Sequence, residues 1–200
     1  MSYSEFTNLT LVKKQFNLVL DETHNLFATV SEITISEKLA ETLSENVPLA
    51  LAIATEKARF ELIIAPILVE LRKLVHHQIS LFSGVEFTMN EEKGLKGICD
   101  FIITRSPEMF TINAPVVMLV EAKNENIKYG LGQCLAEMIA AQEFNHREES
   151  DISQVYGVVT TGNLWKFLVL ENNRVMIDLP EYHISQAGKI LSVLLTMVSL

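Results

Sequence analysis

Two acids and a lysine stand at places in this sequence where charged side chains are unusual. Asp100 interrupts the apolar run GICDFIIT, and Glu121 and Lys123 close the run PVVMLVEAK. A carboxylate inside a strand of Val, Ile and Leu is unfavourable unless it is paired or binds a cation, and two neighbouring carboxylates also repel each other. A divalent metal ion would relieve both problems. Oxygen ligands beside a lysine suit Mg²⁺ better than Zn²⁺.

The relative positions of these residues depend on the two apolar runs being neighbouring strands. Successive side chains of a strand point to opposite faces, so Asp100 is expected to share a face with Ile98 and Ile102. By the same alternation, one face of the second strand is expected to hold Val117, Leu119, Glu121 and Lys123. If the strands pair, the three charged groups meet. Residues 124–126 are polar and end the second strand just beyond Lys123, which predicts a site near a strand end.

The pattern of acid, spacer and acid-X-lysine resembles the signature of the PD-(D/E)XK nuclease superfamily. The resemblance covers about residues 55–170 and implies that Asp100 is the first acid, Glu121 the second acid and Lys123 the lysine. It departs from the name-giving motif in one place, because Ile98-Cys99 rather than a proline precedes Asp100, and many members tolerate that change. The resemblance also implies bound Mg²⁺ or Mn²⁺, held by Asp100, Glu121 and the backbone carbonyl of Ala122.

A long helix is expected from Thr55 to about His77. Thr55 is a suitable N-cap, and apolar residues recur along one stripe at a period near 3.6. Pro66 is expected to kink this helix or to remove one of its hydrogen bonds. On a uniform helix Glu56 projects onto the middle of the apolar stripe, whereas Glu61 lies to its side.

The start of this helix adds a further candidate acid. The segment 55–68 is similar to the first helix of type I restriction-enzyme nuclease domains, which implies that Glu56 is a catalytic acid that reaches a second metal ion or its water shell. The alternative is that Glu56 only complements the dipole of the helix from its first turn.

A second helix is expected from Tyr129 to about Arg147, shortly after the triplet. It places Gln133 and Glu137 on one face, four residues apart. A glutamine here recurs in several branches of the superfamily, so the resemblance implies that Gln133 supports catalysis from behind the metal ligands. If this face meets the sheet, Gln133 would orient water or contact phosphate. The alternative is a solvated face with small alanines.

The remaining stretches complete an α/β domain. The patterns predict a packing helix capped by Ser36, a hairpin from residues 79–88 into the Asp100 strand, a hairpin around Thr161-Gly162-Asn163, and an apolar closing helix at 185–200. The resemblance implies a restriction endonuclease-like αβββαβ core, with a central mixed sheet flanked by helices. A single domain is expected, with peripheral elements and the packing helix in residues 1–54, the core in 55–170, and a C-terminal strand and helix in 171–200.

Composition restricts the classes of protein to consider. The chain has 200 residues, of which 48% are hydrophobic and 20% charged, and a formal net charge of −9. These values fit one folded domain, whereas the negative charge argues against tight non-specific binding to nucleic acid. The two cysteines fall on a predicted strand and a predicted helix, which favours a reduced, cytoplasmic setting. The start MSYSEF has no features of a secretory signal, and no apolar run approaches the ~20 residues of a membrane span.

The expected function is metal-assisted hydrolysis of phosphodiester bonds in nucleic acid, with DNA rather than RNA as the expected substrate and a homodimer or a partner protein as a source of specificity. Lys123 would position or deprotonate the attacking water and offset negative charge. A second reading is a non-catalytic interaction module on the same scaffold, in which Glu121 and Lys123 form an internal salt bridge and bind no ion. A third is an unrelated acidic enzyme that uses the carboxylates for other metal chemistry.

Overall fold

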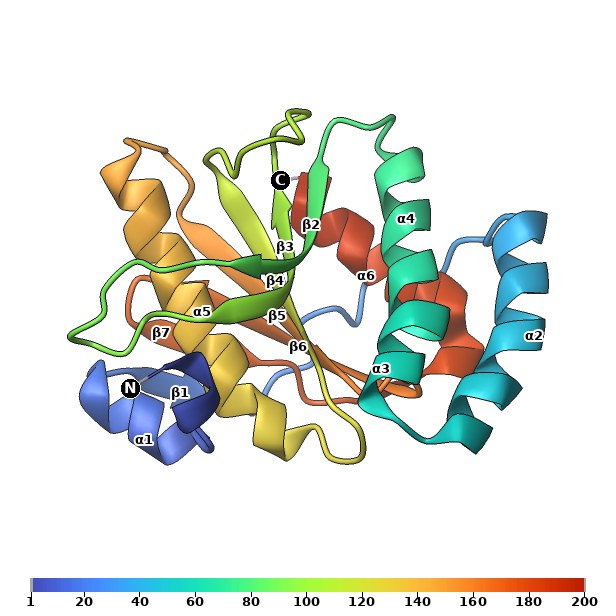
Figure 1. The fold of residues 1–200 in the computed structure, drawn as a ribbon, viewed down its shortest axis with the longest axis horizontal. Coiled ribbons are helices and arrows are strands. Elements are labelled where there is room, and N and C mark those ends of the chain that lie inside the picture. The colour runs from blue at the N-terminus through green and yellow to red at the C-terminus, as the bar shows by residue number, and fades with distance from the viewer. Residues whose placement is uncertain (1, 200) are drawn as a thin grey trace.

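The computed structural model describes residues 2–199 and contains a mixed β-sheet with helices on both faces (Figure 1). The strand order is β1-β7-β6-β5-β4-β3-β2, and β8 pairs with β6. Two neighbouring pairs, β4 with β5 and β1 with β7, are parallel, and the others are antiparallel. The strands are β1 (Val19–Asp21), β2 (Ser80–Glu86), β3 (Ile98–Thr104), β4 (Val116–Ala122), β5 (Gln154–Thr160), β6 (Leu164–Glu171), β7 (Arg174–Ile177) and β8 (Tyr182–His183).

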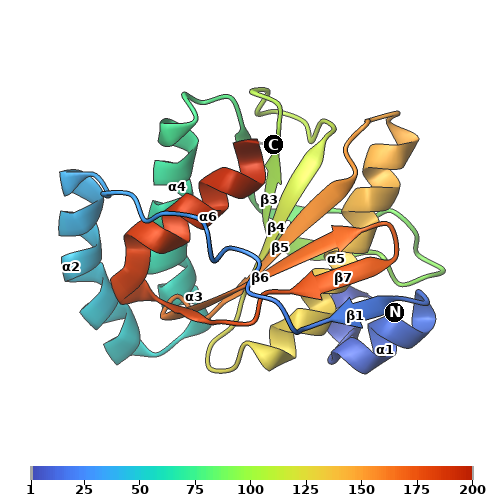
Figure 2. The ribbon, with the colours of Figure 1, turned by 180° about the vertical axis from the view of Figure 1, so that it is seen from behind.

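The helices form a layer on each face of the sheet. They are η1 (Tyr3–Glu5), α1 (Leu9–Gln15), α2 (Glu37–Ile53), α3 (Glu56–Arg59), η2 (Phe60–Ile64), α4 (Ala65–Leu74), α5 (Lys128–Arg147), η3 (Ile184–Gln186) and α6 (Ala187–Ser199). The crossover from β4 to β5 carries α5 over one face, while α4 and α6 cover the other, with α2 outside α4 (Figure 2). A mixed sheet packed against helices, with a helix at the C-terminus, confirms the predicted α/β class.

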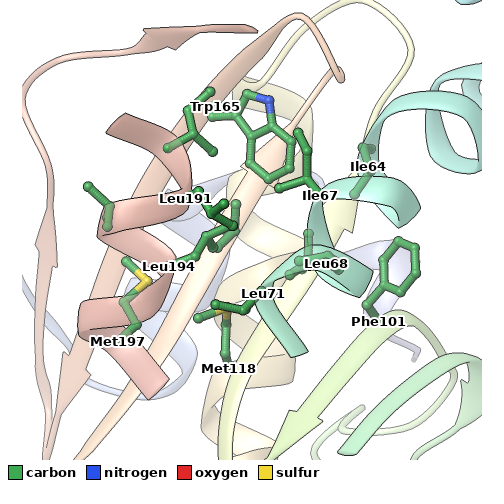
Figure 3. Close-up of a cluster of buried hydrophobic side chains, with 14 of the residues drawn as sticks. Ile64, Ile67, Leu68, Leu71, Phe101, Met118, Trp165, Leu191, Leu194 and Met197 are labelled. Atoms are coloured by element: carbon green, nitrogen blue, oxygen red, sulfur yellow. The ribbon is translucent and has the colours of Figure 1, made fainter. Parts of the chain in front are cut away.

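The larger hydrophobic cluster lies between the sheet and the layer of α4 and α6. Side chains from both helices meet over the strands, with Trp165 of β6 fully buried at one end (Figure 3). Its central members are Ile64, Ile67, Leu68, Leu71, Phe101, Met118, Leu191, Leu194 and Met197. This core fixes the long helix against β3 and β4.

A second cluster lies between the sheet and α5, and the N-terminal segment is part of it. Tyr3 is buried, and its hydroxyl donates to the carbonyl of Phe87 at 2.8 Å. The backbone near Phe6 lies against Gly132 of α5, where a Cβ atom would be 2.3 Å from the carbonyl oxygen of Phe6. The peripheral elements expected for this segment are η1, α1 and β1, and four of its side chains, Tyr3, Phe6, Val12 and Leu18, belong to the core.

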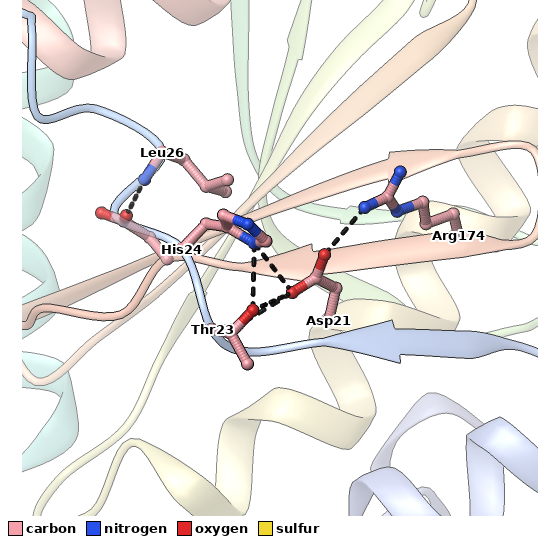
Figure 4. Close-up of polar contacts among 6 residues, drawn as sticks. Asp21, Thr23, His24, Leu26 and Arg174 are labelled. Atoms are coloured by element: carbon pink, nitrogen blue, oxygen red, sulfur yellow. Dashed lines mark hydrogen bonds and ion pairs between the residues drawn. The ribbon is translucent and has the colours of Figure 1, made fainter.

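The end of β1 is tied to the sheet by Asp21 (Figure 4). Its carboxylate pairs with Arg174 of β7 at 2.8 Å and accepts a hydrogen bond from the hydroxyl of Thr23 at 2.9 Å. Nδ1 of His24 lies 3.0 Å from the same carboxylate. These hydrogen bonds hold the pKa of Asp21 below its ordinary value, the bond from Arg174 having the largest effect. This polar cluster fastens an edge strand of only three residues.

The helix predicted for residues 55–77 is continuous but not uniform. Thr55 caps it as predicted, with its hydroxyl oxygen accepting from the N–H of Ala58 at 3.1 Å. The middle section, η2, is a π-helix that ends at Ile64, two residues before Pro66. Proline has no N–H to bond the carbonyl of Leu62, and that carbonyl accepts instead from Nδ2 of Asn46 at 2.9 Å.

The π-helix overturns one prediction. A π turn holds one residue more than an α turn, so it rotates α3 relative to α4 by ~100°. The projection of Glu56 onto the apolar stripe is therefore wrong, and Glu56 is exposed.

Strand alternation also fails at one position. The register of β3 and β4 shifts between Ile103 and Thr104, so that Val117 has no direct partner. Val117 consequently packs in the cluster beneath α4 and α6, whereas Leu119 packs in the cluster beneath α5. The prediction that Val117 and Leu119 share a face is wrong.

Two further properties concern the whole described chain. None of the helices within residues 2–199 is both long enough and apolar enough to cross a bilayer. Cys99 on β3 and Cys134 on α5 are buried free thiols.

Candidate functional site

Asp100 lies where β3 and β4 stop pairing through their backbones. The register between these strands begins at the pair Phe101–Val120. Next to this pair, Oδ2 of Asp100 accepts the N–H of Ala122 at 2.7 Å. The carboxylate of Asp100 thus takes the place of a backbone carbonyl as the acceptor for the N–H of Ala122. This hydrogen bond holds the carboxylate at the end of β4.

Glu121 and Lys123 form an ion pair at the same end of β4. Oε1 of Glu121 pairs with Nζ of Lys123, and the side chain of Glu121 is only 1% exposed. The backbone N–H of Lys123 donates to the carbonyl of Thr160 at 2.8 Å, which ties this residue to the end of β5. The sheet therefore places both charged groups of the triplet on the side covered by α5.

The first turns of α5 supply the next partners. Nζ of Lys123 donates to Oε1 of Gln133 at 3.2 Å, and Nε2 of Gln133 donates to Oε1 of Glu137 at 3.2 Å. Gly130 makes room for this chain of contacts, because a Cβ atom there would lie 3.0 Å from Cγ of Lys123. The face of Gln133 and Glu137 thus meets the sheet, and the solvated alternative is excluded.

Glu137 is a site residue that the sequence analysis did not assign. Its carboxyl is fully buried beneath the sheet, close to Glu121. The only signal in the sequence is its spacing of four residues from Gln133 on an alanine-rich face. That spacing places both residues on one face, but it does not tell whether the face is buried.

Two buried carboxylate oxygens, Oε2 of Glu121 and Oε2 of Glu137, receive no hydrogen bond from an N–H or hydroxyl group within the described residues, and the two carboxyl groups can hydrogen-bond to each other when one of them is protonated. Burial, followed by the negative charge of Asp100, raises the pKa of Glu121 to about 8 against the opposing effect of Lys123. Burial and the charge of Glu121 raise the pKa of Glu137 well above its ordinary value. Such a pair is stable in a core when a proton or a cation compensates the charge.

Burial and neighbouring charges also shift the pKa values of Asp100 and Lys123. Burial raises the pKa of Asp100, although the N–H of Ala122 and the charge of Lys123 oppose this effect. Burial alone would lower the pKa of Lys123, but the charge of Glu121 and the ion pair with it raise that pKa above its ordinary value. Lys123 is therefore an ammonium at neutral pH.

Glu56 reaches the site from the long helix. It lines an open hollow of about 690 Å³ together with Lys123, Asn124, Glu125, Asn126 and Tyr129. The charge of Glu56 raises the pKa of both Asp100 and Lys123. Glu61, by contrast, is on the surface, where its Oε1 lies 3.8 Å from Nζ of Lys57.

The donor set fits Mg²⁺ or Mn²⁺ in kind. No group of three or more His, Cys, Asp or Glu side chains within residues 2–199 is arranged to hold a metal ion as it stands. Mg²⁺ usually takes one or two carboxylates and keeps several waters. The carboxylates of Asp100 and Glu121, with the carbonyl of Ala122, are such a set.

Comparisons with known proteins give no further guide to this site. No protein-family model matches the sequence, and no curated protein matches it.

Proposed function

We propose that this protein is a Mg²⁺- or Mn²⁺-dependent nuclease of the PD-(D/E)XK type that hydrolyses phosphodiester bonds of nucleic acid. The main support is the convergence of Asp100, Glu121 and Lys123 at one end of two neighbouring strands, where two carboxylates lie beside one ammonium group. The observed order of the long helix, β2, β3, β4, α5 and β5 is consistent with a restriction endonuclease-like αβββαβ core.

Each residue has a distinct part in the proposed reaction. Asp100 and Glu121, with the carbonyl of Ala122, would hold the metal ion, and Glu56 would bind its water shell from the edge of the hollow. Bound Mg²⁺ would polarise the phosphoryl oxygen and lower the pKa of a water molecule.

Lys123 and Gln133 act on the phosphate side of the proposed reaction. Because its pKa is raised, Lys123 is suited to neutralise charge on the phosphate oxygens and to position water, and it is not suited to remove a proton. Gln133 accepts from Nζ of Lys123 and so fixes the direction of the ammonium group.

A specific observation favours a second candidate, a non-catalytic interaction module. Glu121 already has an internal cationic partner in Lys123, as that reading predicts. In this case a proton shared within the acidic cluster, rather than a metal ion, would balance the remaining charge.

A metal titration separates the two functions. Mg²⁺ and Mn²⁺ are added to the protein in a calorimeter, and single-stranded and duplex DNA and RNA are incubated with it under the same conditions. If the protein is a nuclease, the metal ions should release or absorb heat on binding, raise the melting temperature and support cleavage of a nucleic acid. Asp100→Asn should weaken all three effects. Absence of heat, thermal stabilisation and cleavage would support the interaction module.

A further inference from the structure

An exposed aromatic ring stands beside the catalytic residues, and the proposed reaction does not use it. Tyr129, in the first turn of α5, is 68% exposed and lines the same hollow as Glu56 and Lys123. Phe110 is also fully exposed. However, it lies in the loop from the end of β3 to the start of β4, at the opposite end of these strands from the site.

The charges of the hollow restrict how it can hold a nucleic acid. Glu56 and Glu125 line it, and the ammonium of Lys123 is engaged with Glu121 and Gln133. Affinity for a duplex depends largely on cationic contacts to the phosphates of two strands. This acidic wall offers little of that kind, and the net charge of the chain is −9.

The groups that remain on the wall suit an unpaired base. An aromatic ring stacks on any base that is not already stacked within a duplex. Asn124 and Asn126 line the same hollow as the ring, and Oδ1 of Asn126 accepts a hydrogen bond from the N–H of Lys128 at 2.9 Å. An amide group can bond to the edge of a base that lies on the ring.

We infer that Tyr129 is a substrate-positioning residue that stacks on an unpaired base next to the scissile phosphate, and that the substrate is single-stranded nucleic acid. This inference rests on the proposed nuclease function of the same site. Stacking on Tyr129 would thus be the reason that the protein prefers a single strand to a duplex.

The test compares Tyr129→Ala, Tyr129→Phe and the control Phe110→Ala with the unaltered protein. Cleavage of a single-stranded DNA oligonucleotide and of the same sequence as a duplex is measured with Mg²⁺ or Mn²⁺. We expect the unaltered protein to prefer the single strand and Tyr129→Ala to lower its kcat/KM there by about 10-fold or more, mainly through KM. Tyr129→Phe, which keeps the ring, and Phe110→Ala should stay within about two-fold.

A binding measurement keeps this inference separate from the nuclease proposal. The anisotropy of a labelled single strand is recorded with Ca²⁺ in place of Mg²⁺. Weaker binding by Tyr129→Ala than by Tyr129→Phe supports stacking even if no cleavage occurs, in which case the nuclease proposal alone fails. Three results would overturn the inference: equal binding by the two variants, equal cleavage by them, or a preference of the unaltered protein for duplex. In each case cleavage itself would still support a nuclease.

Discussion

At the scale of single residues, the site holds more negative charge than its own cation can balance. Lys123 pairs with Glu121, while the charge of Asp100 raises the pKa of Glu121 and the charge of Glu121 raises the pKa of Glu137. The sequence indicated the first three residues because charges inside apolar strands are conspicuous. It did not indicate Glu137, because an acid on a helix is ordinary until its surroundings are known.

The stability of the metal-free protein should therefore depend on pH. The pKa of Glu121 is about 8 in the folded protein against an ordinary value of 4.5, so the folded state binds more protons than the unfolded chain between these values, and the free energy of unfolding falls as the pH rises. The raised pKa values of Asp100 and Glu137 act in the same direction. Glu70 and Glu91 have lowered pKa values and titrate below this window.

Thermal melts in EDTA measure this effect. We expect a melting temperature ~4 °C or more lower at pH 8 than at pH 5.5, since one pKa unit corresponds to about 1.4 kcal/mol. Glu121→Gln should flatten the dependence, and Mg²⁺ should restore stability at pH 8. A melting temperature that rises with pH over this range would contradict the charge balance described for the site.

Lys123→Ala tests the role of the ammonium group. We expect Mg²⁺-dependent cleavage to fall by about 100-fold or more, because a positioned donor near developing charge has an effect of this size. The fold should remain intact, as judged by circular dichroism. The matched control is Lys96→Ala, which removes a lysine from an exposed pair with Glu91 at 2.8 Å, and unchanged cleavage by Lys123→Ala would remove this residue from the mechanism.

At the scale of elements, the site depends on how closely α5 approaches the sheet and the N-terminal segment. Glycines at two positions allow this approach: Gly130 faces Val159 and Lys123, and Gly132 faces the backbone of Phe6–Asn8. The helix itself was predictable from its pattern. Its distance from the sheet was not, because periodicity reports which face is apolar and gives no depth of packing.

Gly132→Ala is expected to destabilise the protein by about 1–3 kcal/mol, because the added Cβ would meet backbone atoms, which cannot move aside as a flexible side chain would. The free energy of unfolding in urea measures the loss. The comparison is Gly130→Ala, whose Cβ would meet the side chains of Val159 and Lys123. When the two variants are compared under conditions in which both are folded, Gly130→Ala should reduce cleavage more than Gly132→Ala does. Equal stability of Gly132→Ala and the unaltered protein would mean that the N-terminal segment is not held against α5.

Most elements followed from local patterns, and the exceptions have local causes. The caps at Ser36 and Thr55 and the two hairpins agree with the sequence analysis. The π-helix before Pro66 and the register shift at Val117 did not follow from the local patterns. Each inserts one residue into a regular period and leaves composition unchanged. Position on a face is lost at such insertions, as the placement of Glu56 shows.

At the scale of the whole molecule, the net charge of −9 would govern how the proposed nucleic-acid substrate approaches. Few phosphates can be neutralised by such a surface, so binding should depend weakly on salt. We expect the logarithm of the association constant for a single strand to fall with the logarithm of salt concentration with a slope shallower than about −3. Fluorescence anisotropy in Ca²⁺ measures this slope, and a duplex competitor in excess should displace little of the strand. A steep slope, or efficient competition by duplex, would show an extended cationic surface that the fold does not suggest.

The π-helix also decides which changes in chain length the position of Glu56 tolerates. Because the π turn already holds one extra residue, deleting one residue from 60–64 would let α3 and α4 merge into a single α-helix with Glu56 still at the hollow. Adding one residue there would instead turn Glu56 by ~100° relative to α4 and take this acid away from the edge of the site. An insertion at this point, unlike a deletion, would therefore alter metal affinity without any substitution among the ligands.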